Sequence, residues 1–124
     1  MDTMNLVGTD DTPNVILDAA NSKFELSGRS LPEDVAAFYK PILSWMEAFA
    51  ETVPDKITFD FKLNYFNTAS SKMILDILLK LEEMNEDNDK VTIRWHYPSN
   101  DEDMKEAGEE YADMVEVPFE MIEY

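Results

Sequence analysis

Two segments of alternating polarity place the strongest constraint on the fold of this chain. The apolar side chains are Ile57, Phe59, Phe61, Leu63 and Tyr65 in residues 56–66, and Val91, Ile93, Trp95 and Tyr97 in residues 90–97. Polar side chains lie between them, and a period of two is typical of a β-strand with one buried and one wet face. Strands buried on both faces are apolar throughout, so we expect helices on only one face of the sheet.

Three segments with helical periodicity accompany these strands. Residues 69–84 place apolar side chains three and four positions apart, and an acidic run over residues 86–89 ends the pattern. We expect an earlier helix over residues 30–52, because Ser30 and Glu33 have the spacing of a capping box, with a kink at Pro41. A third helix over residues 100–114, weakened by Gly108, precedes a closing strand over residues 117–122.

The N-terminal part predicts an arm and a hairpin. Residues 1–13 are polar and predict a loosely ordered arm, and short apolar runs at 15–19 and 23–27 predict the two strands of a β-hairpin. A length of 124 residues suits one compact domain. The sequence therefore predicts a single α/β domain over residues 1–124, a sandwich of one mixed β-sheet with helices packed on one face, in the order β-β-α-β-α-β-α-β.

Charge narrows the class of partner. The chain has 27 Asp and Glu residues against 10 Lys and Arg, which gives a formal net charge of -17. Nucleic acids and anionic membranes would repel it, so we expect a protein partner, although an acidic surface also serves solubility alone. The chain has no cysteine, no secretory signal and no apolar run of membrane-spanning length, so we expect no membrane insertion and a cytoplasmic location.

The sequence contains no motif typical of an enzyme active site or a metal-binding site. The single histidine, His96, lies on the polar side of a predicted strand, and no motif supplies a serine or an acid to partner it. Residues 85–96 do not fit a calcium-binding EF-hand, because Lys90 and His96 occupy the positions of its glycine and glutamate. The glycines form no phosphate-binding loop. We therefore predict no catalytic residue, no metal and no cofactor.

Residues 65–72 join the end of a strand directly to the start of a helix. Thr68 has the expected position of an N-cap, where its hydroxyl would accept a hydrogen bond from the amide of Ser70 or Ser71. A phosphate on that hydroxyl would lie beside unpaired amides at the positive end of the helix dipole, with Lys72 one turn away. The local pattern thus fits both a structural helix cap and a phosphorylation switch.

The same region carries a family resemblance. LNYFNTASSKMILDILLKLEE at residues 63–83, followed by VTIRWHY at residues 91–97, resembles the SiaC family of bacterial regulatory phosphoproteins, and the likeness extends from TPNV at 12–15 to VPF at 117–119. Members of this family look like STAS domains, and the resemblance implies that fold. It also implies that Thr68 is the phospho-acceptor. Adjacency assigns Asn67, Ser70, Ser71 and Lys72 to its surroundings, and Tyr65, Arg94 and His96 are further interface candidates.

The resemblance also implies a function. A regulatory protein of this kind is not an enzyme: a SiaB-type protein kinase and a SiaA-type PPM phosphatase would set its phosphorylation. The unphosphorylated form would bind and activate a SiaD-type GGDEF diguanylate cyclase, which raises cyclic di-GMP and favours biofilm growth. Two alternatives stay open: a STAS-type anti-sigma-factor antagonist that acts by partner switching, and an acidic binding module that is never modified.

Overall fold

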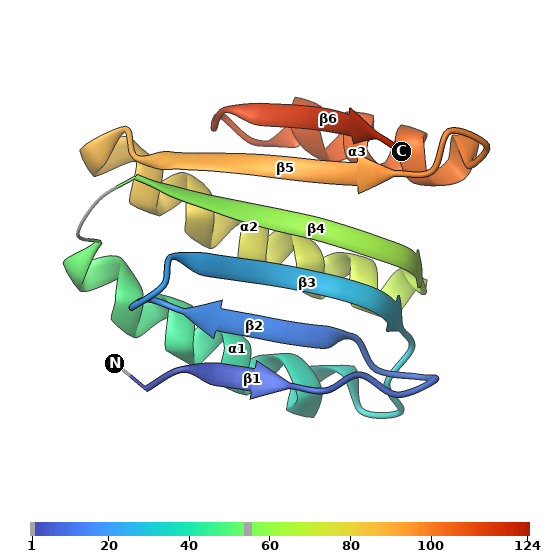
Figure 1. The fold of residues 1–124 in the computed structure, drawn as a ribbon, viewed down its shortest axis with the longest axis horizontal. Coiled ribbons are helices and arrows are strands. Elements are labelled where there is room, and N and C mark those ends of the chain that lie inside the picture. Colours follow the sequence, from blue (N-terminus) through green and yellow to red (C-terminus); the bar gives the residue numbers. More distant parts are fainter. Residues whose placement is uncertain (1, 54–55) are drawn as a thin grey trace.

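The computed structural model describes residues 2–53 and 56–124, which form one sheet with a layer of helices (Figure 1). The strands are β1 Met4–Leu6, β2 Asn14–Asp18, β3 Lys23–Ser30, β4 Ile57–Phe66, β5 Val91–Tyr97 and β6 Phe119–Glu123. The helices are α1 Val35–Phe49, the 3-10 turn η1 Ala50–Thr52, α2 Thr68–Asn88 and α3 Glu102–Met114. The predicted α/β sandwich is confirmed, with one more strand than the sequence indicated.

The order of the strands explains why the helices share one face. The strands lie in the sheet in chain order; β1, β2 and β3 are antiparallel neighbours, and β3, β4, β5 and β6 are parallel neighbours. A helix joins each parallel pair, and such crossovers are right-handed in nearly all proteins. Because the crossovers all step in the same direction, they place α1, α2 and α3 behind the sheet in Figure 1 and leave its front face open.

The core lies between the sheet and these helices. The predicted apolar positions of β5 and those of β4 as far as Leu63 are buried, and they meet buried residues of α1 and α2. The aromatic rings stack along the sheet: the centroids of Phe59 and Phe61 lie 4.7 Å apart, and those of Phe61 and Trp95 lie 5.5 Å apart. The predicted inward faces are therefore confirmed up to Leu63 in β4 and throughout β5.

The prediction of a loosely ordered arm is wrong for residues 2–13. β1 pairs with β2, with Met4 opposite Leu17, and Trp45 donates from its Nε1 to the carbonyl oxygen of Asp2 at 2.8 Å. The hydroxyls of Thr9 and Thr12 are hydrogen-bonded at 2.8 Å in the turn that follows. A strand of three residues is too short for alternation to reveal it, and its order comes from pairing with β2. Met1 lies outside the described residues.

Helix α1 begins later than predicted because Ser30 belongs to a strand. Ser30 is the last residue of β3 and pairs with Phe66 of β4. Asp34 caps the helix instead, with its Oδ1 accepting a hydrogen bond from the amide of Ala37 at 3.0 Å. The helix continues through Pro41 without a break, and this proline is exposed.

A β-bulge near the end of β4 redirects Tyr65. Gly28 of β3 pairs with Leu63, whereas the next residue, Arg29, pairs with Tyr65, so Asn64 is an extra residue in β4. One inserted residue reverses the alternation of the side chains that follow it. Tyr65 is consequently 48% exposed, and its predicted place on the buried face of the strand is wrong.

The last two helices differ from their predictions mainly at the ends. The acidic run expected to end α2 is part of its last turn, and Asp89, with a φ of 52°, closes the helix. Asp101 caps α3, and Gly108 lets this helix approach the sheet, since an added Cβ would lie 2.4 Å from Cδ1 of Trp95. No helix within the described ranges has the length and apolar character needed to cross a membrane.

Candidate functional site

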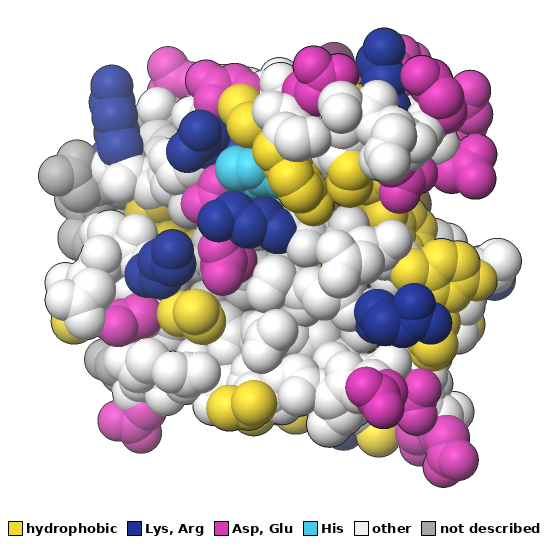
Figure 2. All heavy atoms as spheres, turned by 45° about the vertical axis from the view of Figure 1, so that its right-hand side comes forward, with side chains coloured by type: hydrophobic (Ala, Val, Ile, Leu, Met, Phe, Trp, Pro, Cys, Tyr) yellow, Lys and Arg dark blue, Asp and Glu magenta, His cyan; other side chains and the backbone are white. Residues whose placement is uncertain are grey.

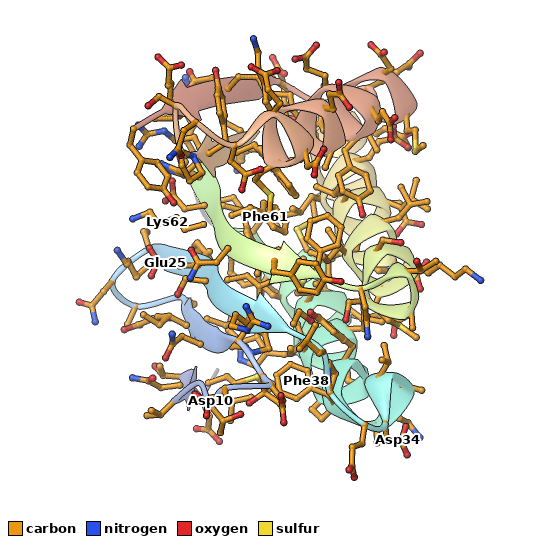
Figure 3. All side chains as sticks on the ribbon, turned by 90° about the vertical axis from the view of Figure 1, so that its right-hand side faces the viewer. Asp10, Glu25, Asp34, Phe38, Phe61 and Lys62 are labelled. Atoms are coloured by element: carbon orange, nitrogen blue, oxygen red, sulfur yellow. The ribbon has the colours of Figure 1, made fainter. Side chains whose placement is uncertain are left out.

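The candidate site lies at the carboxyl ends of β3 and β4, where α2 begins. Figure 3 looks onto this end of the molecule, with the sheet on the left and the helices on the right. A single residue, Asn67, separates β4 from α2, and its backbone is extended, with φ -86° and ψ 175°. The amide of Asn67 donates to the carbonyl oxygen of Ser30 at 3.2 Å. This bond fixes the start of α2 against the neighbouring strand.

Asn67, and not Thr68, is the N-cap of α2. The side-chain Oδ1 of Asn67 accepts a hydrogen bond from the amide of Ser70 at 2.8 Å, and its carbonyl oxygen accepts one from the amide of Ser71 at 3.0 Å. These are the two bonds that define an N-cap residue. The prediction that Thr68 caps the helix is therefore wrong by one position, because the extended backbone ends at Asn67.

Thr68 is the first helical residue, and its side chain is exposed. Its hydroxyl makes no hydrogen bond within residues 2–53 and 56–124. The helical hydrogen bonds begin with the one from Ser71 to Asn67, so the amides of Thr68 and Ala69 have no acceptor inside the helix. The site thus combines a free hydroxyl with two unpaired backbone donors.

Beneath Thr68 lies a cluster of buried hydroxyls from three elements. Ser70 is fully buried, and its Oγ donates to the carbonyl oxygen of Ser30 and accepts from the Ser30 Oγ, each at 2.9 Å. The Oγ of Ser30 lies 2.6 Å from the hydroxyl of Tyr39 in α1. Burial raises the pKa of Tyr39, while the hydrogen bond with Ser30 partly offsets that rise. The cluster holds the first turn of α2 to β3 and α1.

Ser71 and Lys72 lie on the wall of a groove between α2 and α3. The groove has a volume of about 210 Å³ and is lined by Phe66, Ser71, Lys72, Leu75, Ala107, Glu110, Tyr111 and Met114. Ser71 donates from its Oγ to the carbonyl oxygen of Thr68 at 2.6 Å, and its own carbonyl oxygen accepts from the Tyr111 hydroxyl at 2.8 Å. Burial raises the pKa of Tyr111 to about 12. Lys72 is exposed.

Tyr65 and Arg29 form a second exposed feature at this end of the sheet. The β-bulge turns Tyr65 outward, and the guanidinium carbon of Arg29 lies 5.5 Å from the centre of its ring. Arg29 also donates from its Nε to the carbonyl oxygen of Asp10 at 3.3 Å. Sequence reasoning missed Arg29, because the pairing between β3 and β4 that brings it to Tyr65 leaves no local signal in the sequence.

Arg94 and His96 lie elsewhere, on the open face of the sheet in β5. His96 Nε2 lies 2.8 Å from Asp60 Oδ1, and Arg94 lies 3.9 Å from the same oxygen and 3.5 Å from a carboxylate oxygen of Glu120. Figure 2 shows the histidine (cyan) among basic and acidic side chains. No motif in the sequence supplies an acid to partner His96, and the contact with Asp60 arises only because β4 and β5 are neighbours in the sheet.

The start of α2 also differs in charge from the other helix starts. Asp34 caps α1, and Asp101 caps α3, which carries Glu102 and Asp103 in its first turn. The cap of α2 is neutral, and its first turn has no acid. In a chain of net charge -17, α2 is therefore the one helix in the described part that has no carboxylate at its cap or in its first turn.

The structure brings together five of the predicted site residues. They lie together at the start of α2: Asn67 is its cap, Thr68, Ser70 and Ser71 are in its first turn, Lys72 follows one turn after Thr68, and Tyr65 lies just before them in β4. Sequence reasoning missed the buried partners Ser30 and Tyr39, because their hydroxyls meet only in the folded chain. Across the described ranges, no three His, Asp or Glu side chains come together in a way that could hold a metal ion.

Comparison with known proteins gives one family and several similar structures. The family model described as SiaC family regulatory phosphoprotein matches residues 6–124. An uncharacterized protein of Pseudomonas aeruginosa strain UCBPP-PA14 is 31% identical over 119 residues, which cover 96% of this chain and 94% of the relative. These two matches span nearly the whole chain.

Two crystal structures from Pseudomonas aeruginosa agree with the fold. Apo-SiaC is similar with a TM-score of 0.89 and 30% identity, over 98% of this chain and 99% of that one. A chain in the structure of the diguanylate cyclase SiaD in complex with its activator SiaC has a TM-score of 0.91 and 30% identity, again over 98% and 99% of the two chains. The arrangement of one sheet and three helices is therefore common to these proteins.

Proposed function

Because the chain belongs to the SiaC family of regulatory phosphoproteins, we propose that it is a switch set by phosphorylation of Thr68. In this proposal the unphosphorylated form binds and activates a diguanylate cyclase and so raises cyclic di-GMP. One observation carries the assignment: the Thr68 hydroxyl is exposed and unbonded on the first turn of a helix whose start is otherwise held by buried contacts. The complex of the similar SiaC with SiaD supports the choice of partner.

The start of α2 offers a phosphate favourable surroundings. The modification adds roughly -1.5 to -2 charges, which the unpaired amides of Thr68 and Ala69 and the positive end of the dipole would stabilise. No acid in the first turn opposes it, and Lys72 lies one turn away on the exposed side of the helix. The fold therefore needs no rearrangement to accept the phosphate, and the effect of the modification falls on what binds there.

A phosphate at this position weakens docking even of a basic protein. Two exposed unit charges about 4 Å apart attract each other by only about 1 kcal/mol in water. A partner that covers Thr68 must remove water from the phosphate, and desolvation of an ion costs several kcal/mol. A basic side chain offsets that cost only when its pairing with the phosphate is close and well oriented, so an interface shaped for the small threonine hydroxyl favours the unphosphorylated form.

The remaining parts of the proposal concern the proteins that set the switch. A SiaB-type protein kinase adds the phosphate and a SiaA-type PPM phosphatase removes it, both in the cytoplasm. The chain itself is a regulator and not an enzyme. The contact between Asp60 and His96 does not alter this view, because the same Asp60 carboxylate lies 3.9 Å from Arg94, which also pairs with Glu120 on the open face of the sheet.

The test combines mass spectrometry with a cyclase assay. The protein is purified from its host, its phosphorylated and unphosphorylated forms are separated, and fragment spectra locate the phosphate. Each form is then added to the diguanylate cyclase of the same host while cyclic di-GMP is measured. We expect the phosphate on Thr68 and activation by the unphosphorylated form alone. The variant Thr68→Ala should activate and resist the kinase, whereas Ser71→Ala, which removes another hydroxyl of the same turn, should still be modified.

Three outcomes would contradict the proposal. A phosphate on Ser71 instead of Thr68 would move the switch to another residue. Equal activation by both forms would favour an acidic binding module without a switch. Binding to a regulator that itself holds a transcription factor, with no effect on the cyclase, would favour the anti-sigma-factor antagonist.

A further inference from the structure

A second groove of the helical layer lies between α1 and α2, three turns along α2 from Thr68. We propose that this groove docks the phosphatase that restores Thr68, through an amphipathic helix of that enzyme with apolar side chains on one face and Lys or Arg beside them. The inference rests on the proposed function and assigns a surface of this chain to one of its partners.

Two neighbouring helices form the groove. The helices α1 and α2 pack against each other behind the sheet, and the groove between them has a volume of about 470 Å³ (Figure 1). Leu43 of α1 and Leu79 of α2 are its apolar side chains. Leu79 is 40% exposed, so water covers much of a large apolar side chain in the free protein. A channel between two packed helices accepts a third helix, whose side chains enter at spacings of three and four.

Charge selects a basic occupant. The carboxylates of Glu47, Asp76, Glu82 and Glu83 line the groove together with the ammonium group of Lys80. Lys80 Nζ lies 2.9 Å from a carboxylate oxygen of Glu83 and 4.0 Å from one of Glu47, and the hydrogen bond with Glu83 raises the pKa of Lys80. The excess of negative charge repels nucleic acid and also a second copy of this chain, whose net charge is -17. A helix with Lys or Arg beside an apolar stripe complements the carboxylates and the leucines together.

The groove is separated from Thr68 along the axis of α2. Leu79 follows Thr68 by eleven residues, which is about 16 Å at a rise of 1.5 Å per residue. A segment seated around Leu79 therefore leaves Thr68 uncovered. Its binding does not require that a phosphate on Thr68 lose its water, so the groove can hold the chain in either form.

This separation is what a phosphatase requires. Its substrate is the phosphorylated chain, in which the start of α2 carries an ion that is costly to bury in an interface. An enzyme held at a distant groove reaches the phosphate with its active site alone. The cyclase and the kinase, by contrast, bind the chain while Thr68 carries only its hydroxyl, so the phosphate does not hinder them.

The kinetics of dephosphorylation test the groove. The phosphorylated chain is the substrate of the phosphatase of the same host, and Leu79→Lys is compared with Val7→Lys, which changes an 84% exposed apolar residue just after β1. We expect Leu79→Lys to raise KM about tenfold at unchanged kcat, because docking binds substrate and transition state alike, and Val7→Lys to change KM less than about threefold. The unphosphorylated wild-type chain should inhibit competitively, and unphosphorylated Leu79→Lys should inhibit about tenfold more weakly.

Cross-linking locates the contact, and the absence of cysteine from the sequence makes the label specific. Unphosphorylated Leu79→Cys and Val7→Cys are each labelled with benzophenone maleimide, mixed with the phosphatase and irradiated. We expect cross-links from position 79 to a Lys- or Arg-bearing helix of the phosphatase and few from position 7. This readout does not depend on how well Leu79→Lys folds.

The outcomes separate this inference from the proposed function. If the phosphatase acts on the wild-type chain but Leu79→Lys keeps the wild-type KM, the groove is the wrong surface and the switch stands. Weaker cyclase activation by unphosphorylated Leu79→Lys would show that both partners share the surface, and cross-links between two copies of this chain would show self-association; either result overturns the assignment. If the phosphatase leaves a phosphate on Thr68 of the wild-type chain, its part of the proposed function fails as well. Circular dichroism of Leu79→Lys is the folding control, and lysine is a good helix former.

Discussion

The assignment of the helix cap predicts opposite outcomes for two adjacent substitutions. Asn67→Ala removes the Oδ1 that accepts from the Ser70 amide at 2.8 Å, and Ser70 is fully buried, so water cannot readily replace that acceptor. Loss of an N-cap costs about 0.5–2 kcal/mol, and burial places this case in the upper part of that range, at about 1–2 kcal/mol. Thr68→Ala removes a hydroxyl without a bond and adds a better helix former, so stability should change by less than about 0.5 kcal/mol.

Urea denaturation followed by tryptophan fluorescence measures both effects. With a slope of about 2 kcal/mol per molar urea, the midpoint of Asn67→Ala should fall by roughly 0.5–1 M, while that of Thr68→Ala should stay close to wild type. The double variant should equal Asn67→Ala alone. If Thr68→Ala lost as much stability as Asn67→Ala, the threonine would be part of the cap. The phosphorylation test with Thr68→Ala would then no longer separate signalling from folding.

Two further predictions concern α3. Gly108→Ala should lower the free energy of unfolding by about 1–2 kcal/mol, because the added Cβ would lie 2.4 Å from Trp95 and the overpacking outweighs the gain in helix propensity of about 1 kcal/mol. Thermal denaturation measures this, and a variant as stable as wild type would show that Trp95 can move. Burial raises the pKa of Tyr111 from 10.0 to about 12, so the unfolded chain releases this proton first and stability should fall as pH rises between these values. Tyr111→Phe should make that fall shallower in alkaline urea titrations, and an unchanged slope would contradict the assignment.

The sheet and the packing of helices on one of its faces could be predicted because the alternation of apolar and polar residues repeats along each strand. Apolar and polar side chains alternate over Ile57–Phe66 and Val91–Tyr97, which indicates strands that are buried on one face. The helical spacing of the apolar side chains in α2 indicates a helix that packs against that face. A shift of the strand register by one residue would bring polar side chains into the core, so the hydrophobic pattern determines which face of each strand is buried. The placement of all helices on one face followed from the same alternation.

The N-terminus of α1 shows where local pattern fails. Ser30 and Glu33 have the spacing of a capping box, yet Ser30 pairs with Phe66 in the sheet and its hydroxyl is buried against Ser70 and Tyr39. The buried hydrogen bonds and the strand pairing outweigh a cap, and Asp34 takes that role. Both sets of contacts join residues distant in the sequence, so no local rule could find them.

The candidate site was predicted in composition but not in detail. Asn67 and Thr68 are both good capping residues, and a one-residue choice between them depends on the bond from Asn67 to Ser30 in β3. Tyr65 was misplaced for a related reason. The extra residue Asn64 is visible only when β4 is paired with β3, and the outward turn that it causes is what brings the ring to Arg29.

The one-residue shift of the cap strengthens the assignment of Thr68 as a switch. A capping hydroxyl would be occupied in the folded state, so its phosphorylation would break a bond that holds the helix and would change stability together with binding. A hydroxyl at the first helical position is free, while Asn67 and the buried Ser70 hold the helix independently of it. A phosphate there would change the exposed surface at the start of α2 without breaking a hydrogen bond that holds the helix. The proposed switch requires this separation, because a phosphate on Thr68 would then affect binding of the partner and not the stability of the fold.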